Sequence, residues 1–572
     1  MRHKDAISAA ILLLLEACSG GGGGGAGGGG IGTIPEPAPA PTNVTVTDLK
    51  TSQAFQNDAA GMKLALDLTT RTGVSGQVRP NSLTVSYDAG TRSYTISADG
   101  RSQGFGPAEI QTSGGGETIY QKTASGDRDY LTVTTTPYTS TRSNQYVGLA
   151  YWQHNVVSGT RQDMDFYVFT YGLPTAAAAV PRTGTAGFRT DMFGAVSAPG
   201  QEPRAFQGQG EFSIDFGAGV FSAHNYLTET SLVTGQSVMG GGIEFTGAGH
   251  LSASGFTGNA LYRGWFGSAG GSLNGRFYGP NSEELGGAFS GSNGNGMTVV
   301  GGFTGQRDAG VPVENLTLTN LTRPQLFYEG YINNLVSQLN WQNSETFTYG
   351  TPTSDLYGGQ FTINDKVASS DPNFTTYRKS FSSGYDTQDV TLRLYKPGNG
   401  NTELALTYAS FTHYSTTVPV GLGRQRVDQY GGYGLATPDG LLMGKTGTGS
   451  YRGILHGTGR QYPSTVFYDV KGTSLFTVDF GAQNYTGALS MAGTASDGSG
   501  SIDFGSYDVA GRLTLTGTTG FLSRGGVEAG QFAPRFYGPD GEEIVAPFSV
   551  TAPTGAPGAG ITIQGVAAAR RQ

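Results

Sequence analysis

The sequence predicts an all-β protein built as two related lobes. Apolar and polar residues alternate in short runs along most of the chain, and this period of two is typical of strands with one buried face. Six segments of the first half recur in order in the second half, which indicates an internal duplication. At 572 residues the chain is too long for one core. Extended helical periodicity is absent after the first residues, and the nearest candidate is the stretch from Tyr331 to Trp341.

Two hairpins show the alternation. Residues 82–97 hold two alternating runs around the turn at 88–91, where Asp, Ala, Gly and Thr follow one another. In the second half an alternating run at 390–394 precedes the turn Lys-Pro-Gly-Asn-Gly at 396–400, and 404–408 is expected to be the returning strand.

The recurring segments keep nearly the same separation. The offset is 257–264 residues throughout, which small loop insertions explain. The pairs are Tyr120–Lys122 with Tyr377–Lys379, Leu149–Tyr151 with Leu406–Tyr408, Thr183–Thr185 with Thr446–Thr448, Phe212–Ala218 with Phe476–Ala482, Ile243–Phe245 with Ile502–Phe504, and Phe277–Pro280 with Phe536–Pro539.

Composition excludes several classes of function. A formal charge of −8 without a cationic cluster argues against nucleic-acid binding. The single cysteine excludes a disulfide and a thiolate metal cluster in the folded part. The six histidines show no short ligand spacing and no HExxH motif, and no GxSxG element lies near them. We therefore expect no catalytic residues, no metal and no cofactor.

The amino terminus predicts export and lipidation. Residues 1–17 combine a basic start, Met1–Lys4, with the apolar run Ala6–Leu15, which is too short to span a bilayer and is typical of a signal peptide. The run ends Leu-Glu-Ala-Cys, which resembles a bacterial lipobox with Cys18 as the acylated residue. Glu16 departs from that pattern.

Residues 18–44 are expected to form a tether. The tract Gly20–Gly30 is almost pure glycine and cannot pack, and prolines between 35 and 41 stiffen the exit. Ser19 directly after the cysteine resembles the signal that sends lipoproteins of Gram-negative bacteria to the outer membrane. We therefore expect a lipid-anchored, surface-exposed position at the outer membrane.

The most specific motif is Phe-Tyr-Gly-Pro followed by Glu and Gly-Gly. Its pattern predicts a strand end, a turn and a strand start. The second half keeps the first part but has Ile544–Phe548 in place of the Gly-Gly element, so the final turn there is expected to differ. The motif residues are Phe277, Tyr278, Gly279, Pro280, Glu284, Gly286, Gly287 and Phe289, with Phe536, Tyr537, Gly538 and Pro539 in the second half.

This motif, the Cys-Ser-polyglycine start and the duplication together resemble transferrin-binding protein B, a bilobed surface lipoprotein family. The resemblance implies that each lobe pairs a β-rich handle domain with an eight-stranded antiparallel β-barrel, which is filled by its own side chains or holds one small ligand. The implied divisions are a first handle at 45–180, its barrel at 181–305, a linker at 306–322, a second handle at 323–417, its barrel at 418–550 and a tail at 551–572.

The resemblance also implies a function. The protein is expected to act as a binding co-receptor, not an enzyme. It would capture a transferrin-like or other nutrient carrier, with iron as the expected nutrient, and present it to a TonB-dependent receptor. The loops of the first lobe are the expected contact surface, and no individual residue within them is singled out as a contact. Two alternatives stay open: a structural or adhesive surface lipoprotein, and a carrier of haem or a small hydrophobic molecule.

Other chemistry-bearing residues favour structural roles. Glu283 and Glu284 are adjacent on a strand and point to opposite faces, so they suit turn capping better than paired acid catalysis. Asp215 and Asp479 are expected to face solvent. The three tryptophans, at 152, 265 and 341, are expected in the core.

Overall fold

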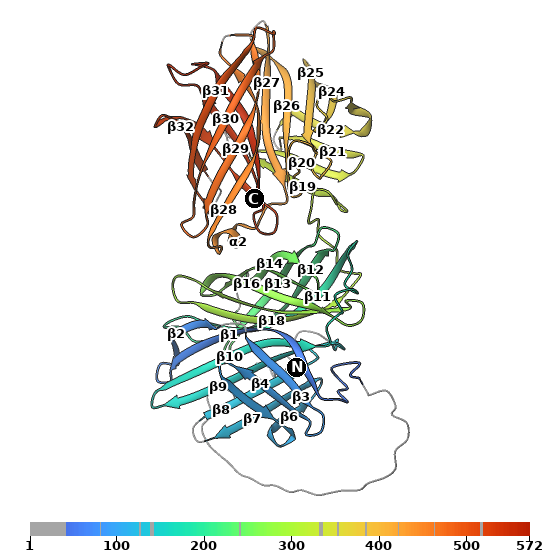
Figure 1. The fold of residues 1–572 in the computed structure, drawn as a ribbon, viewed down its shortest axis with the longest axis vertical. Helices are drawn as coiled ribbons and strands as arrows, with labels where there is room; N and C mark the ends of the chain where they lie inside the picture. The colour runs from blue at the N-terminus through green and yellow to red at the C-terminus, as the bar shows by residue number, and fades with distance from the viewer. Residues whose placement is uncertain are drawn as a thin grey trace. The chain divides into compact units, whose positions relative to one another are not determined.

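The computed structural model describes residues 42–572 except 80–81, 125–126, 138–141, 239–241, 331–335, 352–353, 384–385, 421–422, 463 and 515–518. The predicted signal peptide, Cys18 and most of the tether therefore lie outside the described residues. The chain divides into two compact units, residues 1–313 and 314–572 (Figure 1). This division falls inside the predicted linker.

The handle of the first unit is an antiparallel sheet. Its strand order is β5-β4-β3-β1-β10-β9-β8-β7-β6, and β2 also pairs with β1. The predicted hairpin at 82–97 is β3 and β4, paired from Leu83↔Ala98 to Asp88↔Ser93. The strands are β1 (Gln53–Asp67), β2 (Thr72–Arg79), β3 (Leu83–Asp88), β4 (Ser93–Ala98), β5 (Arg101–Phe105), β6 (Ile110–Gly114), β7 (Glu117–Ala124), β8 (Asp127–Thr134), β9 (Val147–Ser158) and β10 (Arg161–Gly172), with a 3-10 turn η1 (Pro107–Glu109).

The second part of the first unit is a closed barrel of eight consecutive strands. It closes by pairing of its first and last strands, from Phe188↔Arg307 to Ser197↔Thr298. The strands are β11 (Thr185–Ser197), β12 (Arg204–Asp215), β13 (Val220–Ser231), β14 (Glu244–Leu251), β15 (Gly255–Gly264), β16 (Gly267–Tyr278), β17 (Glu284–Ser292) and β18 (Thr298–Arg307).

The handle of the second unit has the order β22-β21-β20-β19-β27-β26-β25-β24-β23. It extends to Gly434, beyond the predicted end at 417. Residues 336–341 of the candidate helix are strand, and 331–335 lie outside the described residues. The elements are β19 (Gln325–Gly330), β20 (Val336–Asn343), β21 (Thr346–Thr351), β22 (Ser354–Thr362), η2 (Ile363–Asp365), β23 (Lys366–Val367), β24 (Phe374–Ser383), β25 (Asp386–Tyr395), β26 (Ala409–Val420) and β27 (Gly423–Gly434).

The second barrel also closes, because β28 pairs with β36 and β33 pairs with β35. Ala533 and Pro534 separate β33 from β34, which together correspond to β16. A short helix α2 (Asp439–Met443) precedes the barrel. The strands are β28 (Thr448–Arg460), β29 (Phe467–Asp479), β30 (Asn484–Ala495), β31 (Ser501–Arg512), β32 (Thr519–Arg524), β33 (Val527–Phe532), β34 (Arg535–Tyr537), β35 (Glu543–Thr551) and β36 (Thr562–Arg571).

Two boundaries predicted for the second lobe were wrong. The barrel was expected at 418–550, but its first strand begins at Thr448, because β26 and β27 belong to the handle sheet. The segment 551–572 was expected to be a tail, yet it contains β36, which closes the barrel. The all-β fold of two handle–barrel lobes is confirmed.

The duplication is visible in the strands, with one change of register. The pair β9 and β10 corresponds to β26 and β27 at an offset of 262 residues (409 − 147 and 423 − 161). The predicted match of Leu149–Tyr151 with Leu406–Tyr408 is therefore out of register by five residues, and 404–408 is not a strand. The strand that returns beside β25 is β26, with Leu394 opposite Thr412.

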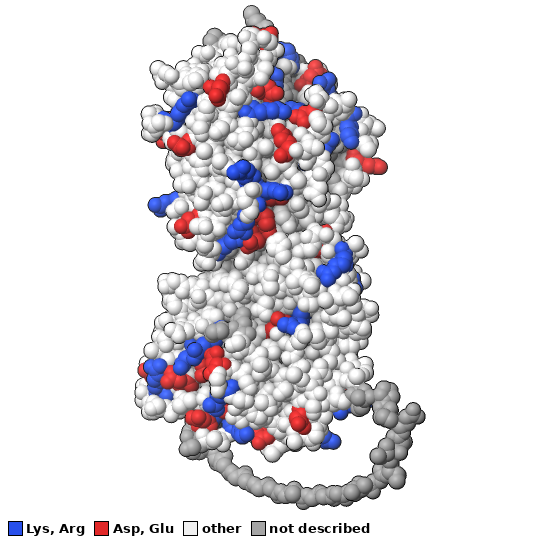
Figure 2. Space-filling model, in the orientation of Figure 1, with Lys and Arg blue, Asp and Glu red and all other residues white. Residues whose placement is uncertain are grey.

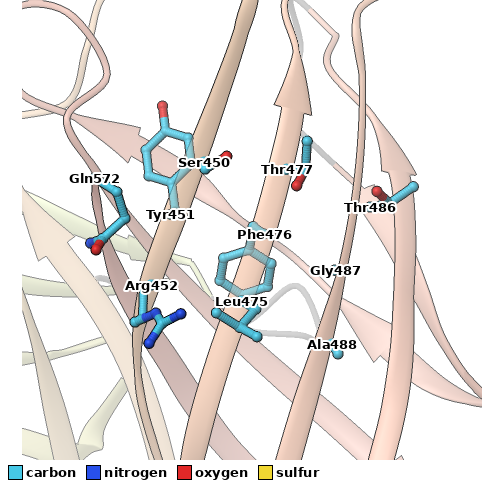
Figure 3. A pocket seen from close by; sticks show the side chains of 10 residues that line it. All are labelled: Ser450, Tyr451, Arg452, Leu475, Phe476, Thr477, Thr486, Gly487, Ala488 and Gln572. Atoms are coloured by element: carbon cyan, nitrogen blue, oxygen red, sulfur yellow. The ribbon is translucent and has the colours of Figure 1, made fainter.

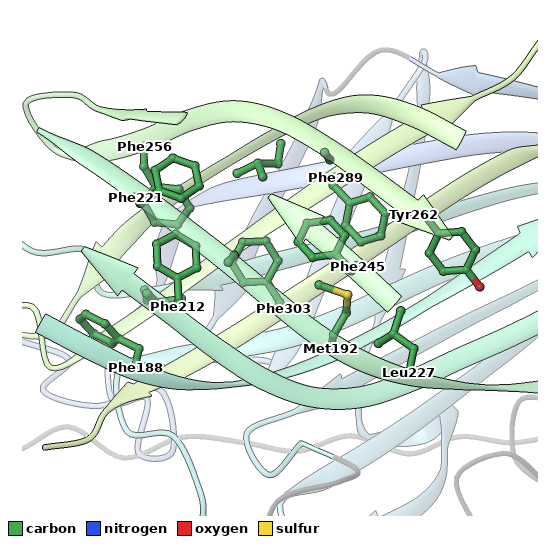
Figure 4. Close-up of a cluster of buried hydrophobic side chains, with 14 of the residues drawn as sticks. Phe188, Met192, Phe212, Phe221, Leu227, Phe245, Phe256, Tyr262, Phe289 and Phe303 are labelled. Atoms are coloured by element: carbon green, nitrogen blue, oxygen red, sulfur yellow. The ribbon is translucent and has the colours of Figure 1, made fainter. Parts of the chain in front are cut away.

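Aromatic side chains fill the first barrel (Figure 4). Phe212 and Phe221 stack with ring centroids 4.8 Å apart, and Phe245 lies 4.5 Å from Phe289. All four side chains are at most 1% exposed. The lumen is therefore a packed core, one of the two states expected of a small barrel. No helix among the described residues combines the length and apolar character needed to cross a membrane.

Candidate functional site

The Phe-Tyr-Gly-Pro motif joins each barrel to its handle. In the first unit the turn after Tyr278 binds the segment that links handle to barrel: Leu173 O accepts from Gly279 N, and Thr175 Oγ1 donates to Gly279 O at 2.6 Å. Leu435, Thr437 and Gly538 repeat these contacts in the second unit. We call this side of each unit the latch end. The motif is therefore structural.

One glutamate of the motif is central to the latch. The Glu284 carboxylate is 4% exposed and accepts hydrogen bonds from three consecutive handle amides, those of residues 145–147, at 2.7–3.0 Å. Glu543 accepts from residues 407–409 at 2.6–2.9 Å. Burial raises the pKa of both carboxyls against the lowering effect of these amides, that of Glu543 to about 7. Glu283 instead caps its own turn through the Asn281 amide.

The Gly-Gly element lets the handle approach the barrel closely. A Cβ on Gly286 would lie 2.9 Å from Val147 Cγ2 of the handle. At the corresponding place the second unit has Val545, and the glycine is on the handle instead, because a Cβ on Gly432 would lie 2.6 Å from Val545 Cγ1. The prediction that the final turn differs was wrong: Gly279 and Gly538 have φ of 84° and 89°. The small residue of the joint thus lies on the barrel in the first unit and on the handle in the second.

The opposite end of the first unit carries the exposed loops. Alternation of the barrel strands places the connecting residues 198–203, 232–238, 242–243, 265–266 and 293–297 at one end. The β1–β2 hairpin of the handle joins them, because Gly73 N donates to Gln201 O and Gly200 N donates to Gly73 O, both at 2.8 Å. We call these segments the loop end.

Trp265 is the most distinctive residue of the loop end. Its side chain is 60% exposed, so the expectation that it lies in the core was wrong. Its backbone N–H donates to Glu229 Oε1 at 2.9 Å, and the same oxygen accepts from Tyr262 Oη at 2.7 Å. Glu229 is fully buried, with Arg204 Nε 3.7 Å from its Oε2. The Arg204 guanidinium lies 6.0 Å from the indole and 5.3 Å from the Phe266 ring.

This arrangement holds a large apolar side chain in solvent. A buried carboxylate is costly unless it is hydrogen-bonded and paired, and Glu229 has both kinds of partner. Its bonds fix the β15–β16 tip, so Trp265 is presented on a rigid support. Exposed apolar side chains of β2 are also present, with Val74 50% and Val78 37% exposed. Such residues suit contact with another macromolecule.

The other candidates of the sequence analysis are structural. Trp152 is buried and donates to Asp129 Oδ1 at 3.0 Å. Asp215 is buried, not solvent-facing, and its Oδ1 accepts from Ala218 N at 2.9 Å. Asp479 makes the same contact with Ala482 in the second barrel. The described residues contain no group of three or more side chains suited to hold a metal ion.

A shallow groove of about 340 Å³ lies on the outer wall of the second barrel (Figure 3). Its lining includes Arg452, the half-exposed Leu475 and the hydroxyls of Ser450 and Thr477, but no carboxylate, histidine or cysteine side chain. A hydroxyl nucleophile there would lack a general base from this lining.

On the drawn face of the first unit, charged side chains are sparse over the barrel strands (Figure 2).

Comparison with known proteins agrees with the architecture. Residues 142–307 match the family model described as the C-lobe and N-lobe beta barrels of Tf-binding protein B. This range covers β9 to β18, that is, the first barrel with the handle strands and latch segment packed on it. No curated protein matches the chain in sequence.

Solved structures of two transferrin-binding proteins B are similar at low identity. A double mutant of the Haemophilus parasuis Hp5 protein is 17% identical, with 77% of this chain and 85% of that chain covered and a TM-score of 0.27. The isotype 1 protein of serogroup B Neisseria meningitidis is 17% identical over 79% and 86%, with a TM-score of 0.26. The N-lobe of lactoferrin binding protein B of Moraxella bovis is 17% identical over 34% and 81%, with a TM-score of 0.19. The first barrel, with the handle strands and latch segment packed on it, is therefore similar to the barrels of Tf-binding protein B.

Proposed function

We propose that this protein is an outer-membrane surface lipoprotein that captures a nutrient carrier, with iron as the nutrient, and presents it to a TonB-dependent receptor. The observation that carries the proposal is the family match over the first barrel and its latch. The family model is described as part of a protein that binds transferrin. Cys18 would carry the lipid and the glycine tract would hold the first unit away from the membrane.

The capture surface is proposed to be the loop end of the first unit, with Trp265 as its anchor. A packed lumen leaves no enclosed site for a small ligand in the first barrel, so recognition takes place on the outside. Burying an indole held on a rigid support loses little side-chain entropy, which is typical of residues that dominate protein interfaces. The same packed lumen disfavours the alternative of a haem or hydrophobic-ligand carrier.

The test uses cells that display the full-length protein. Iron-loaded transferrin and iron-loaded lactoferrin serve as probes, each with its iron-free form as control. Surface binding of one probe, together with growth on it as sole iron source that is lost on deletion of this protein, would support the proposal. Loss of cell adhesion on deletion, with iron uptake from both probes unchanged, would instead support the adhesive alternative.

A further inference from the structure

The two units join handle to barrel with different chemistry. In the first unit the joint is a continuous apolar cluster that includes Met62, Leu64, Tyr151 and Phe166 of the handle and Phe193 of the barrel. Tyr151 and Phe193 stack across it with ring centroids 5.0 Å apart. Handle and barrel of the first unit therefore share one core.

Six positions of this cluster hold polar or titratable residues in the second unit, whereas Leu149 and Val168 are replaced by the aromatic residues Phe411 and Tyr430. Strand register sets the correspondence, with offsets of 262 in β9 and β10, 263 in β11 (448 − 185) and 264 in β18 (562 − 298). The replacements are Tyr151 by His413, Met164 by Arg426, Phe166 by Asp428, Phe193 by His456, Ala195 by Thr458 and Val300 by Gln564. Val300 is fully buried, whereas Gln564 is exposed. The handle therefore covers less of the barrel wall in the second unit than in the first.

The contacts across this second joint are polar as well as aromatic. His456 Nε2 of the barrel lies 3.0 Å from Glu403 Oε2 of the handle, and Lys471 Nζ lies 3.2 Å from Asp371 Oδ2. Tyr430 Oη lies 2.8 Å from Thr458 Oγ1. Partly exposed ion pairs of this kind contribute little stability compared with a buried apolar cluster.

A buried histidine lies at the centre of the handle side. His413 Nε2 is 2.7 Å from Asp428 Oδ1, which also accepts from Arg426 Nη2 at 2.7 Å. Asp428 Oδ2 and Arg426 Nε are buried, with no hydrogen-bond partner among the described residues. A partly satisfied buried network of this kind is costly. The handle–barrel joint of the second unit is therefore weaker at the positions where the first unit has its apolar cluster.

We propose that the handle of the second unit separates from its barrel on mild acidification, turning about the latch end, while the first unit stays closed. The latch keeps the hydrogen bonds of Gly538 and Thr437 described above, so it forms the hinge. The connecting segment 435–447 is the covalent link between the two parts. This inference does not depend on which carrier the first unit captures.

The direction with pH follows from the surroundings of His413. Arg393 of β25 lies opposite His413. Three residues of β27 also face it: Arg426, Asp428 and Tyr430. From the barrel, β29 brings Asp469 and Lys471 to the same joint. Burial lowers the pKa of His413, partly opposed by Asp428. The closed joint thus prefers neutral His413, and each pH unit below ~6.5 raises the open-to-closed ratio by up to about tenfold.

The experiment measures spin-label distances in the full chain. Cys18 is the only cysteine, so the C18A chain accepts a labelled pair at T387C and T465C across the second joint. A second pair, T160C and Q201C, labels the handle and the barrel of the first unit. We expect a longer distance to gain population in the second unit between about pH 7.5 and 5.5, with no change in the first.

A graft provides the second arm. The variant H413Y/R426M/D428F gives the handle of the second unit the residues of the first, and it should remain closed over the same pH range. An unchanged distance in the parent second unit would overturn the proposal, and this result does not require the graft to fold. Equal opening of the grafted chain would overturn the role of this cluster.

Discussion

Replacing Glu543 with Gln tests the latch of the second unit. The carboxyl is 4% exposed, and burial raises its pKa to about 7 from an ordinary 4.5. A raised carboxyl pKa means that the folded chain holds the proton more tightly than the unfolded chain. Its contribution to stability is therefore fully present below about pH 4.5 and is lost as the pH rises to about 7.

The size of this effect follows from the pKa. The two values differ by about 2.5 pH units, which corresponds to roughly 3 kcal/mol at ~1.4 kcal/mol per unit. The glutamine of E543Q also places an NH2 group where one carboxyl oxygen accepts from the amides of residues 407–409, which adds an offset of about 1–3 kcal/mol. Urea denaturation of the parent and the E543Q chain at several pH values isolates the difference between them.

The parent should lose stability relative to E543Q between about pH 4.5 and 7, and the Glu543 carboxyl should titrate near 7 in carbon NMR. E284Q is the matched variant of the first unit, where the pKa is also raised and the direction should be the same. A difference that stays flat across this range, or a Glu543 titration near 4.5, would refute the reasoning.

Three further predictions concern anchoring and folding. C18A should release the mature protein from washed membranes, and its retention there would exclude lipid anchoring. Deleting 551–572 removes β36 and should abolish the cooperative unfolding transition of the second unit in calorimetry. The isolated chain 314–572, which keeps β36, should show a cooperative transition in the same measurement. G279A should destabilise the first unit by about 2 kcal/mol or more, because φ is 84° and the new Cβ would meet Tyr146 at 2.6 Å. G200A, with φ of 74° and open space around it, is the control and should cost about 1 kcal/mol in the same denaturation assay.

The fold was predictable because its local signals are strong. The hairpin at 82–97 has short alternating strands and a clear turn, and the Phe-Tyr-Gly-Pro motif marks equivalent turns in both units. The last strand was missed because β36 lacks alternation: Ala567, Ala568 and Ala569 are all fully buried, since the handle covers the outer face there. A strand buried on both faces does not show the period of two.

The site was less predictable, because exposure depends on tertiary contacts. Nothing in the sequence around Trp265 separates an exposed tip from a core position. Its support comes from Glu229, Arg204 and Tyr262, which lie on other strands. Glu283 and Glu284 were expected to be adjacent on a strand, but Glu283 lies in the turn before β17, and the handle amides that bind Glu284 are about 140 residues away in sequence.

The most direct test of the central claim is the affinity of the full-length protein for whichever of the two probes, iron-loaded transferrin or iron-loaded lactoferrin, binds to cells that display it. W265A should weaken binding by roughly thirtyfold or more, the loss expected when an interface anchor is truncated. Y462A removes an aromatic side chain that is 79% exposed in the second unit, and it should leave the affinity unchanged. Unchanged binding by W265A, or an equal loss in Y462A, would contradict capture at the loop end of the first unit.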